Sequence, residues 1–479
     1  MKSIAETATK EISYASYPMT VVTPMFGGSE SPWRVNCLQP IRSSSVRGHL
    51  RFWWRATRGA ACKDAAALHD KETEIFGSTD KPSPVKIWIT QSHDKDSTDS
   101  PFKPKFNNRK KKNELVLDKS KFPSYALFPL ANMEEEEKAD IKYLVPGYHF
   151  TVNIQYELHN LSSLSLDKLK LEVECALWAW VNFGGIGART RRGCGSLYCE
   201  KLAPAPQVNS LDSYRQWFQK CLDKYELLLE PDGPVRDWPT LSGSIMVAPI
   251  PEAILDSWKH GIERYRSFRS KRSEKRDPTT GQKQFGRSHW PEADSIRALT
   301  GTGLKRHLKS TTLPRGAAFP RAQLGLPIIF HFKQPSARDR RDPNEGYEPF
   351  DTSLMPEDGD RLASPLIVKA LAISPFKAYA AAIALNQPKL GKLKLMRQSK
   401  RREDNHWHYL EFKREFTKAT IESDQIYSEL NYLPDREQNN PMIDRIGRKT
   451  GSTIKAFMAT LSTKKEGDEP WTPLLDTSY

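Results

Sequence analysis

The chain has 479 residues, a formal net charge of +15 at pH 7 and 38% hydrophobic residues. This length exceeds what one ordinary hydrophobic core needs, so the sequence predicts two or three domains. The positive charge indicates a polyanionic partner, either a nucleic acid or an anionic membrane surface. No apolar run approaches the roughly 18 residues of a membrane-spanning helix, and the N-terminal MKSIAETATK lacks the apolar segment of a secretion signal. We therefore expect a cytoplasmic protein without a membrane segment.

The six cysteines do not indicate a metal centre or a disulfide framework. None of them forms a C-x-x-C pair, and Cys194 and Cys199 lack a second pair at a spacing that zinc sites use. In a long basic chain without an export signal, reduced buried thiols are expected. The sequence therefore predicts neither a metal ion nor a cofactor.

In the N-terminal part, here taken as a domain at 1–204, strand and helix patterns alternate. Strands are expected at 12–26, 85–90, 125–130, 148–158 and 196–202, and helices from Ser44, at 65–75 and at 165–181. Apart from 125–130, this is the β-α-β-β-α-β order of a ferredoxin-like domain, which is also the fold of the commonest RNA-binding module. The aromatic signature of that module is missing, so we expect a loop, and not the sheet face, to contact RNA. The polar, charged insertion at about 92–121 is expected to be a mobile loop.

The most distinctive stretch is the glycine–arginine loop, residues 184–195, which reads GGIGARTRRGCG and has no acidic residue. Glycine lets a ligand approach the main chain closely, and successive peptide N–H groups in such a loop form a concavity that binds anions. Arginine adds charge and bidentate hydrogen bonding to phosphate. The alternative is a flexible surface turn with solvated arginines. The predicted RNA contacts in this loop are Gly184, Gly185, Gly187, Arg189, Thr190, Arg191, Arg192 and Gly193.

The helix expected from Ser44 carries a basic stripe beside an apolar one. Val46, Leu50 and Trp53 form the packing face, and four arginines recur at helical spacing with no acidic residue between them. Four cations in register favour a phosphate-facing stripe over a merely solvated surface. The four arginines are Arg47, Arg51, Arg55 and Arg58. The predicted RNA contacts of this region, including the loop before the helix, are Arg42, Ser43, Arg47, Arg51, Trp54 and Arg55.

A catalytic role has only weak candidates. A metal-independent ribonuclease needs a general base and a general acid, which are usually histidines. His49 lies on the basic helix between Arg47 and Arg51 and is the best candidate, with a partly exposed histidine on a helix face as the alternative. His289, beside Trp290, is second, and base stacking or a phosphate contact is its preferred role. We therefore expect a protein that is not an enzyme.

A second cycle of strands and helices follows a helical linker at 205–240. Strands are expected at 244–250, 361–373, 377–385 and 407–412, helices at 254–268 and 443–461, and polar loops at 264–276 and 335–360. The whole pattern predicts an α+β fold of two ferredoxin-like (RRM-like, βαββαβ) domains with basic loop insertions, the second at 241–479. Tyr265 and Trp290 are candidates to stack a base. The predicted RNA contacts here are Arg287, His289, Trp290, Arg297, Arg315 and Arg321.

Several of these segments resemble the RAMP superfamily of CRISPR proteins. The glycine–arginine loop, with the following Ser196 and Leu197, is similar to the signature loop of that superfamily. Further segments are similar to one subunit family of the Cmr module, the type III-B CRISPR effector. These segments are PIRSSSVRGHLRFWWRA at 40–56, GRSHWPEADSIR at 286–297, FPRAQLGLPIIFHF at 319–332 and RLASPLIVKAL at 361–371. Together they run in order over most of the chain.

The resemblance implies two ferredoxin-like domains and a non-catalytic RNA-binding subunit of a Cmr ribonucleoprotein, which acts in antiviral defence. Such a subunit would hold the 3′ part of the guide RNA (crRNA), or help to capture target RNA, beside other RAMP subunits. Two alternatives stay open. One is a metal-independent endoribonuclease that processes guide RNA, and the other is a generic basic scaffold or membrane-surface protein.

Overall fold

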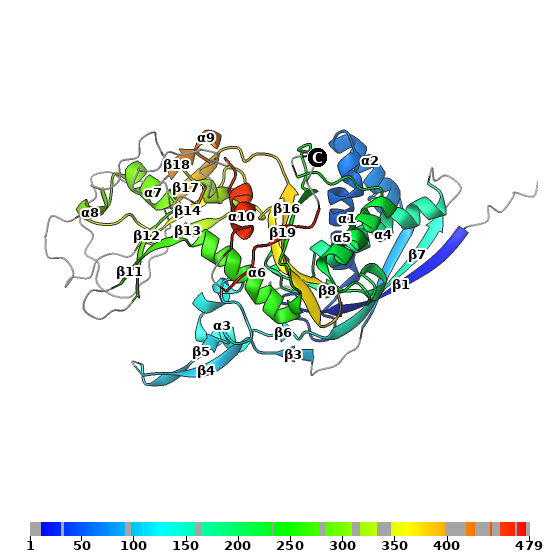
Figure 1. The fold of residues 1–479 in the computed structure, drawn as a ribbon, viewed down its shortest axis with the longest axis horizontal. Coiled ribbons are helices and arrows are strands. Elements are labelled where there is room, and N and C mark those ends of the chain that lie inside the picture. Colours follow the sequence, from blue (N-terminus) through cyan, green and yellow to red (C-terminus); the bar gives the residue numbers. More distant parts are fainter. Residues whose placement is uncertain are drawn as a thin grey trace, which may run out of the picture. The chain divides into compact units, whose positions relative to one another are not determined.

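The fold of the chain, in a computed structural model, is shown in Figure 1. The structure describes residues 11–29, 33–91, 97–108, 110–158, 164–231, 233–276, 283–308, 317–332, 346–397, 418–426, 441–442, 451–464 and 467–475. It confirms the predicted α+β class, since helices and several antiparallel sheets occur in both halves. Within this part of the chain, no helix is long and apolar enough to cross a membrane.

The chain folds as two compact units. The first combines residues 1–265 with 366–388 and 461–479, and the second comprises 266–365 and 389–460. The predicted linker at 205–240 does not coincide with this division. Its helix, α5 (Leu211–Lys224), buries Tyr214 against Tyr379, with ring centroids 5.3 Å apart. One continuous hydrophobic core therefore joins segments that the sequence assigned to separate domains.

The first sheet has four antiparallel strands in the order β2-β7-β1-β8. Its elements follow the chain order predicted for residues 12–202, and the helix expected at 65–75 is α2 (Ala65–Phe76). The elements are β1 (Glu11–Val21), α1 (Ser43–Ala56), β2 (Val85–Gln91), β7 (Tyr148–Leu158), α4 (Leu166–Phe183) and β8 (Leu197–Tyr198).

Only one side of this sheet is covered. Along β1, Tyr17, Met19 and Val21 are buried, whereas Ile12 and Tyr14 on the other side are exposed, as the two-residue repeat of a strand requires. The buried side belongs to the same hydrophobic core as α1 and α4, and from Cys175 to Phe183 every residue of α4 is buried. The uncovered side is exposed to solvent among the described residues.

A second sheet completes the first unit. It contains the predicted strand pair, because β15 and β16 are antiparallel neighbours. β9 and the short β10 lie along the other side of β16, and β19 pairs with β9. The helix α6 (Ile254–Arg269) follows β10 in the chain. The strands are β9 (Thr240–Val247), β10 (Glu252–Ala253), β15 (Leu366–Ala372), β16 (Lys377–Asn386) and β19 (Thr472–Pro473).

The second unit has its own core, in which Phe319, Leu354 and Leu395 are buried. Its main sheet has the antiparallel order β13-β14-β17-β18, and β11 and β12 form a separate hairpin. The strands are β11 (Arg272–Arg276), β12 (Lys283–Ser288), β13 (Ile328–Phe330), β14 (Thr352–Pro356), β17 (Leu393–Arg397) and β18 (Lys418–Ile421). The helices are α7 (Glu292–Thr300), α8 (Lys305–Leu308), α9 (Ser423–Ile426) and α10 (Thr453–Leu461).

Two expectations for the N-terminal half were wrong. The described part of the insertion at 92–121 is not an irregular loop, because β4 (Phe102–Asn107) and β5 (Lys112–Leu117) form a hairpin that buries Phe102 opposite Leu117. The strand predicted at 125–130 is absent. A 3₁₀ helix, Phe128–Asn132, lies there instead, since Pro129 has no N–H for a sheet ladder and suits the first turn of a helix. The strand predicted at 407–412 lies outside the described residues.

Candidate nucleic-acid interface

The glycine–arginine loop is tightly packed and not a flexible surface turn. Gly187, Gly193 and Gly195 have φ values of 85°, 77° and 62°. A Cβ atom added to Gly195 would lie 1.9 Å from the carbonyl oxygen of Ile186, and one added to Gly187 would lie 2.3 Å from that of Phe26. Glycine is therefore required at these positions both by conformation and by close approach of the backbone.

Side chains from three other segments hold the loop in place by hydrogen bonds to its carbonyl oxygens. The Thr23 hydroxyl donates a hydrogen bond of 2.6 Å to the carbonyl oxygen of Gly193. The Trp258 indole N–H donates one of 2.7 Å to the carbonyl oxygen of Arg192. Lys369, buried in β15, donates to the carbonyl oxygen of Gly184 at 2.8 Å, and burial lowers the pKa of its ammonium group to about 7. The loop thus has one fixed conformation.

The side chain of Arg192 is buried and forms its hydrogen bonds within the fold. Its guanidinium donates hydrogen bonds to the Leu366 carbonyl at 2.9 Å and to the Tyr265 hydroxyl at 3.0 Å, and only 9% of the residue is exposed. Tyr265 is completely buried. The predicted phosphate contact of Arg192 and the predicted base stacking by Tyr265 are therefore wrong.

Arg189 and Arg191 remain at the surface of the loop, each half-buried over an aromatic ring. The guanidinium carbon of Arg189 lies 5.3 Å from the ring centroid of Phe128, whose exposed fraction is 53%. That of Arg191 lies 5.8 Å from the ring centroid of Phe52. Burial lowers both pKa values, that of Arg191 to about 10, so both side chains stay charged at neutral pH. Thr190 lies between them.

The arginines in the basic stripe of α1 have partners within the fold, which offset only part of their charge. The Nε of Arg51 and the Nη1 of Arg55 lie 2.5 and 2.6 Å from the same carboxylate oxygen of Glu72, which α2 supplies. Arg47 donates hydrogen bonds to the carbonyl oxygens of Phe76 and Val85. Since Phe76 is the last residue of α2, the first of these bonds caps the C-terminal end of that helix. The partners of these arginines come from other parts of the chain. Arg47 is engaged within the fold, whereas the side chains of Arg51 and Arg55 remain 35% and 33% exposed, so their contact with phosphate stays a prediction.

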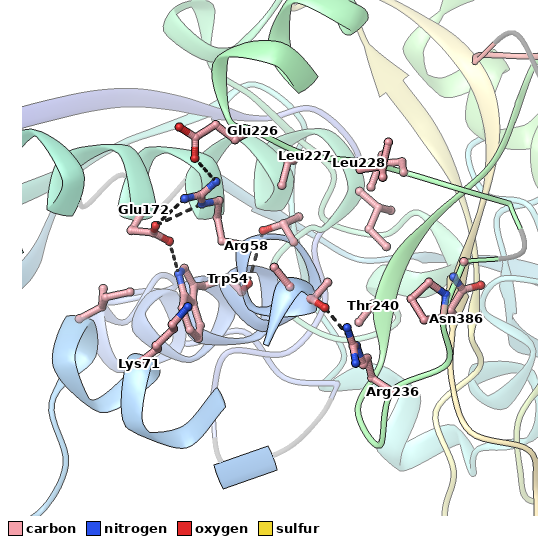
Figure 2. A pocket seen from close by; sticks show the side chains of 18 of the residues that line it. Trp54, Arg58, Lys71, Glu172, Glu226, Leu227, Leu228, Arg236, Thr240 and Asn386 are labelled. Atoms are coloured by element: carbon pink, nitrogen blue, oxygen red, sulfur yellow. Dashed lines mark hydrogen bonds and ion pairs between the residues drawn. The ribbon is translucent and has the colours of Figure 1, made fainter. Parts of the chain in front are cut away.

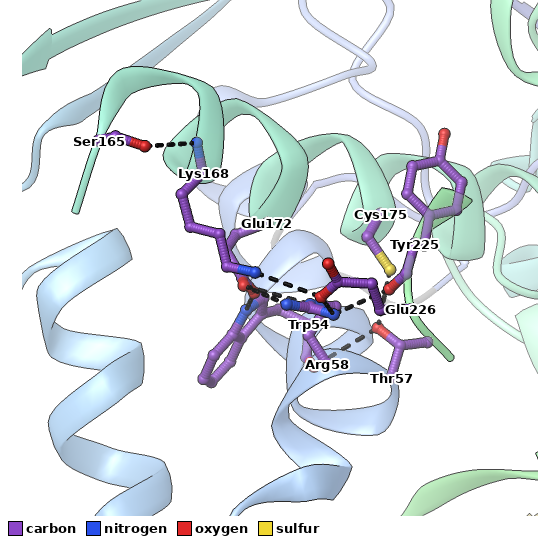
Figure 3. Close-up of polar contacts among 9 residues, drawn as sticks. All are labelled: Trp54, Thr57, Arg58, Ser165, Lys168, Glu172, Cys175, Tyr225 and Glu226. Atoms are coloured by element: carbon purple, nitrogen blue, oxygen red, sulfur yellow. Dashed lines mark hydrogen bonds and ion pairs between the residues drawn. The ribbon is translucent and has the colours of Figure 1, made fainter. Parts of the chain in front are cut away.

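Arg58 and Trp54 belong to a partly buried polar network at the edge of a cavity of about 630 Å³ (Figure 2). Arg58 lies 2.9 Å from Glu172 and 2.8 Å from Glu226, and the Trp54 indole donates to Glu172 at 2.7 Å. Figure 3 shows Lys168 reaching the same carboxylate of Glu226, at 3.3 Å. Trp54 is thus a core residue, and its predicted contact with RNA is wrong.

Two predicted residues before and at the start of α1 stay accessible. Arg42 is exposed and makes no hydrogen bond or ion pair through its side chain with the described residues, and Ser43 is half-buried. Their segment lies near the glycine–arginine loop, because Gly28 packs against the carbonyl oxygen of Pro40 and both Gly28 and Gly187 pack against Met25. Arg42 and Arg189 are therefore the predicted residues that best keep a cation available.

The predicted contacts in the second unit are mostly structural. Trp290 is buried and donates a hydrogen bond to the carbonyl oxygen of Phe268, so it cannot stack a base. Arg297 forms ion pairs with Asp294 at 2.8 Å and Glu348 at 2.7 Å. Arg321 pairs with the buried Glu292 at 3.1 Å. His289 is half-buried beside Trp290. Arg315 and the side chain of Arg287 lie outside the described part of the structure.

The weak catalytic candidate, His49, packs face to face on Trp180, with ring centroids 5.7 Å apart and an interplanar angle of 13°. Burial lowers the pKa of its imidazole to about 4, so the ring is neutral at physiological pH. Its side chain makes no hydrogen bond with the described residues, so no group there orients its proton. Among those residues, no group of three or more His, Cys, Asp or Glu side chains could hold a metal ion.

The sequence contained a signal for the acidic partners that was missed. Glu72 lies on the apolar face of α2 with Leu68 and Ile75, and Glu172 lies on that of α4 beside Val173. An acidic residue inside an apolar stripe needs a buried cationic partner, so both positions predict ion pairs. No sequence signal indicated Phe128, since its approach to Arg189 depends on the tertiary fold.

One part of the chain matches a known family model. Residues 19–198 match the model of the RAMP superfamily. This segment contains the end of β1, the other three strands of the first sheet, α1 and the glycine–arginine loop. The resemblance to RAMP proteins is therefore confirmed for the part of the chain that carries these features.

The chain is also similar to two Cmr1 subunits of the CRISPR Cmr system of Pyrococcus furiosus. It is 29% identical to subunit Cmr1-1 over 192 residues, which cover 38% of this chain and 50% of that protein. It is also 29% identical to subunit Cmr1-2 over 195 residues, which cover 39% of this chain and 96% of that protein. The chain thus spans about half the length of the first of these relatives.

Two solved structures are also similar in part. The crystal structure of Cmr1 from Pyrococcus furiosus in its apo form matches with a TM-score of 0.41 and 19% identity, over 88% of this chain and 97% of that one. A chain of the type III-B Cmr-beta complex bound to cognate target RNA, solved by cryo-EM, matches with a TM-score of 0.42 and 14% identity, over 79% of this chain and 96% of that one.

Proposed function

We propose that the chain is a non-catalytic RNA-binding subunit of a type III-B Cmr ribonucleoprotein. Its partners would be guide RNA, target RNA and the other RAMP subunits, and it would hold the 3′ part of the guide or help to capture the target. The RAMP match and the similarity to Cmr1 subunits support the assembly. The net charge of +15 supports the RNA partner.

The observation that carries the RNA-binding proposal is the surface pair of Arg189 and Phe128. The guanidinium lies over an exposed ring, has no acidic partner among the described residues, and keeps its Nε buried without a hydrogen-bond acceptor. Because the protein covers that Nε, only the accessible part of the half-buried guanidinium could donate to a phosphate oxygen, and the exposed ring of Phe128 offers a face to a base. Arg42 adds a second exposed cation in the same region.

The β4–β5 hairpin offers a second basic surface in the same unit (Figure 1). Lys105, Lys111 and Lys112 are exposed and form no ion pairs with the described residues, and Phe106 is 57% exposed. Lys105 and Lys112 lie on one side of the hairpin, where Glu114 stands opposite Lys105, whereas Phe106 lies on the other side. The hairpin therefore adds positive charge to the unit but does not combine its lysines and its exposed ring on one surface.

We also infer that both sheets of the first unit are ferredoxin-like. In chain order the second sheet reads β9, α6, β15, β16, α10, β19, and its spatial order β15-β16-β9-β19 repeats that of β2-β7-β1-β8 in the first. On this reading α10 and the last residues of α6, which cluster with the second unit, belong to the same ferredoxin-like domain as the second sheet. The remainder of the second unit consists of two insertions, one between α6 and β15 and one between β16 and α10. The predicted domain at 241–479 would then be a ferredoxin-like domain interrupted twice.

The Arg189→Ala variant tests the RNA-binding proposal. If Arg189 contacts a phosphate of single-stranded RNA, its removal should lower the slope of log K against log salt by about 0.7. The measurement is a salt titration of the binding of labelled guide-like RNA to the purified full chain. The Arg42→Ala variant should give a similar loss.

The matched control is Arg34→Ala, which removes the same charge from an exposed arginine that is already paired with Asp140 at 2.8 Å. Its salt slope should stay that of the wild type. Equal effects of Arg34→Ala and Arg189→Ala would mean that only net charge matters and would refute a specific contact.

The ribonuclease alternative predicts RNA cleavage that is lost in the His49→Ala variant, whereas the RNA-binding proposal predicts no cleavage. Because this imidazole is neutral and stacked on Trp180, we expect no discrete RNA product between about pH 5 and 8, with or without magnesium. The measurement is a gel assay of labelled RNA incubated with wild type and with His49→Ala. A product that the wild type forms and the variant does not would favour the nuclease.

A further inference from the structure

The uncovered side of the first sheet, here called the open sheet face, carries aromatic side chains in solvent. Tyr14 on β1 is 67% exposed and Trp88 on β2 is 43% exposed. Large rings are expensive to leave in water, and the open sheet face presents two of them from different strands. Helices cover only the opposite side of these strands, so the open sheet face is a surface without an assigned partner among the described residues.

The strand register fixes where the two rings stand. Tyr14 is opposite Gln155 of β7, and Trp88 is opposite Asn153, two residues earlier on the same strand. β7 lies between β1 and β2, so the two rings are two strand spacings and two residues apart. This places them roughly 12 Å from each other across the sheet. The rings are thus separate platforms and do not stack on each other.

Amide side chains lie between the platforms. The Ser16 hydroxyl donates to the Asn153 Oδ1 at 2.8 Å, and the Asn153 Nδ2 donates to the Thr90 hydroxyl at 3.0 Å. These two bonds fix the orientation of the amide, which keeps a second N–H donor and a lone pair for a ligand. Gln155, the next outward residue of β7, is half-buried. Oriented amides beside aromatic faces suit the edges of unpaired bases.

Lysines occupy both edges of the open sheet face. Lys86 on β2 is 60% exposed, although it pairs with Glu157 at 2.7 Å. Lys201, which follows β8, is exposed and donates to the carbonyl oxygen of Ser16 at 2.8 Å. A strand of phosphates crossing the open sheet face would meet the charge of Lys201 at one edge, whereas Glu157 already balances the charge of Lys86 at the other.

We infer that the open sheet face binds single-stranded RNA, with one unpaired base on Tyr14 and another on Trp88. This inference rests on the proposed function, but it places a contact away from the glycine–arginine loop and on the surface that the sequence excluded. Each ring offers a flat face that a base can cover whatever its identity. A duplex buries the faces of its bases, so the open sheet face should discriminate against it.

The test compares the full-length double variant Tyr14→Ala/Trp88→Ala with the wild type. The probes are a fluorescein-labelled oligouridine of about 12 nucleotides and an RNA duplex of the same length. The loss of two stacking contacts should weaken binding of the single strand by at least about tenfold. The salt slope should not change, because no charge is removed. The conservative variant Tyr14→Phe/Trp88→Phe should bind within about threefold of the wild type, since it keeps both rings.

The control is Phe376→Ala, which removes an 80% exposed ring from the turn between β15 and β16 and should leave binding unchanged. Because Tyr14 and Trp88 are exposed, thermal unfolding of the double variant should match that of the wild type. If the double alanine variant binds the single strand as tightly as the wild type, the open sheet face is not an RNA platform, and a protein partner becomes its better occupant. If the wild type itself does not bind the single strand even at low salt, the proposed RNA-binding function is refuted, and the inference about the open sheet face falls with it.

Discussion

Replacing Gly195 by alanine should lower the free energy of unfolding by more than about 4 kcal/mol, a loss that few single substitutions cause. The new Cβ would lie 1.9 Å from the carbonyl oxygen of Ile186, and the residue would have to keep a φ of 62°. The backbone cannot move away, because the Ile186 N–H donates to the carbonyl oxygen of Gly195 at 2.9 Å. Urea unfolding followed by tryptophan fluorescence measures the effect.

Gly147→Ala separates the two causes of this loss. Gly147 has a φ of 95°, but a Cβ there would meet nothing within 4 Å. Its replacement should cost only the conformational penalty, about 1–2 kcal/mol. If Gly195→Ala were no worse than Gly147→Ala, the close approach at Gly195 would not be rigid, and the loop would be more adaptable than its contacts indicate.

Replacing Lys369 by methionine should flatten the rise of stability with pH between about 7 and 10. Burial lowers the pKa of this lysine to about 7 in the folded chain, whereas an unfolded lysine titrates near 10.4. In this window the unfolded chain binds a proton that the folded chain does not, so the wild type gains stability as the pH rises. The gain should be of the order of 1 kcal/mol per pH unit.

The measurement is the free energy of unfolding of the wild type and of Lys369→Met between about pH 6 and about pH 10, in steps of about one pH unit. The difference between the two proteins cancels the titration of all other groups. The variant also leaves the carbonyl oxygens of Val181 and Gly184 without their donor, which costs about 1–3 kcal/mol at every pH. If the difference in unfolding free energy between the two proteins did not change with pH, the pKa of Lys369 would not be lowered in the folded chain.

Together these two positions explain why a loop rich in glycine is not flexible. Gly195 brings two backbone segments into contact, and Lys369 holds the carbonyl oxygen of Gly184 at the end of α4. The loop therefore presents Arg189 and Arg191 over their rings in a fixed arrangement. A fixed arrangement reduces the ordering cost of binding RNA.

The sequence alone determined the local elements of the first sheet and the strand pair β15–β16. Strict alternation defines β7, whose predicted bounds match Tyr148–Leu158, and apolar residues at helical spacing define α4. These patterns are local, because each side chain's direction follows from its own strand or helix. The resemblance of the glycine–arginine loop to RAMP proteins was likewise contained in neighbouring residues.

Only the tertiary structure decided which arginines are available. In the sequence, Arg51 and Arg55 form part of a basic stripe, but in the fold both pair with Glu72 of α2. Arg192 likewise donates a hydrogen bond to a carbonyl oxygen of β15. An ion pair depends on residues far apart in the chain, and helical spacing carries no information about them. The open sheet face could not be predicted for the same reason. A strand pattern shows that Tyr14 and Trp88 point outward, but it does not show that they lie on the same side of one sheet.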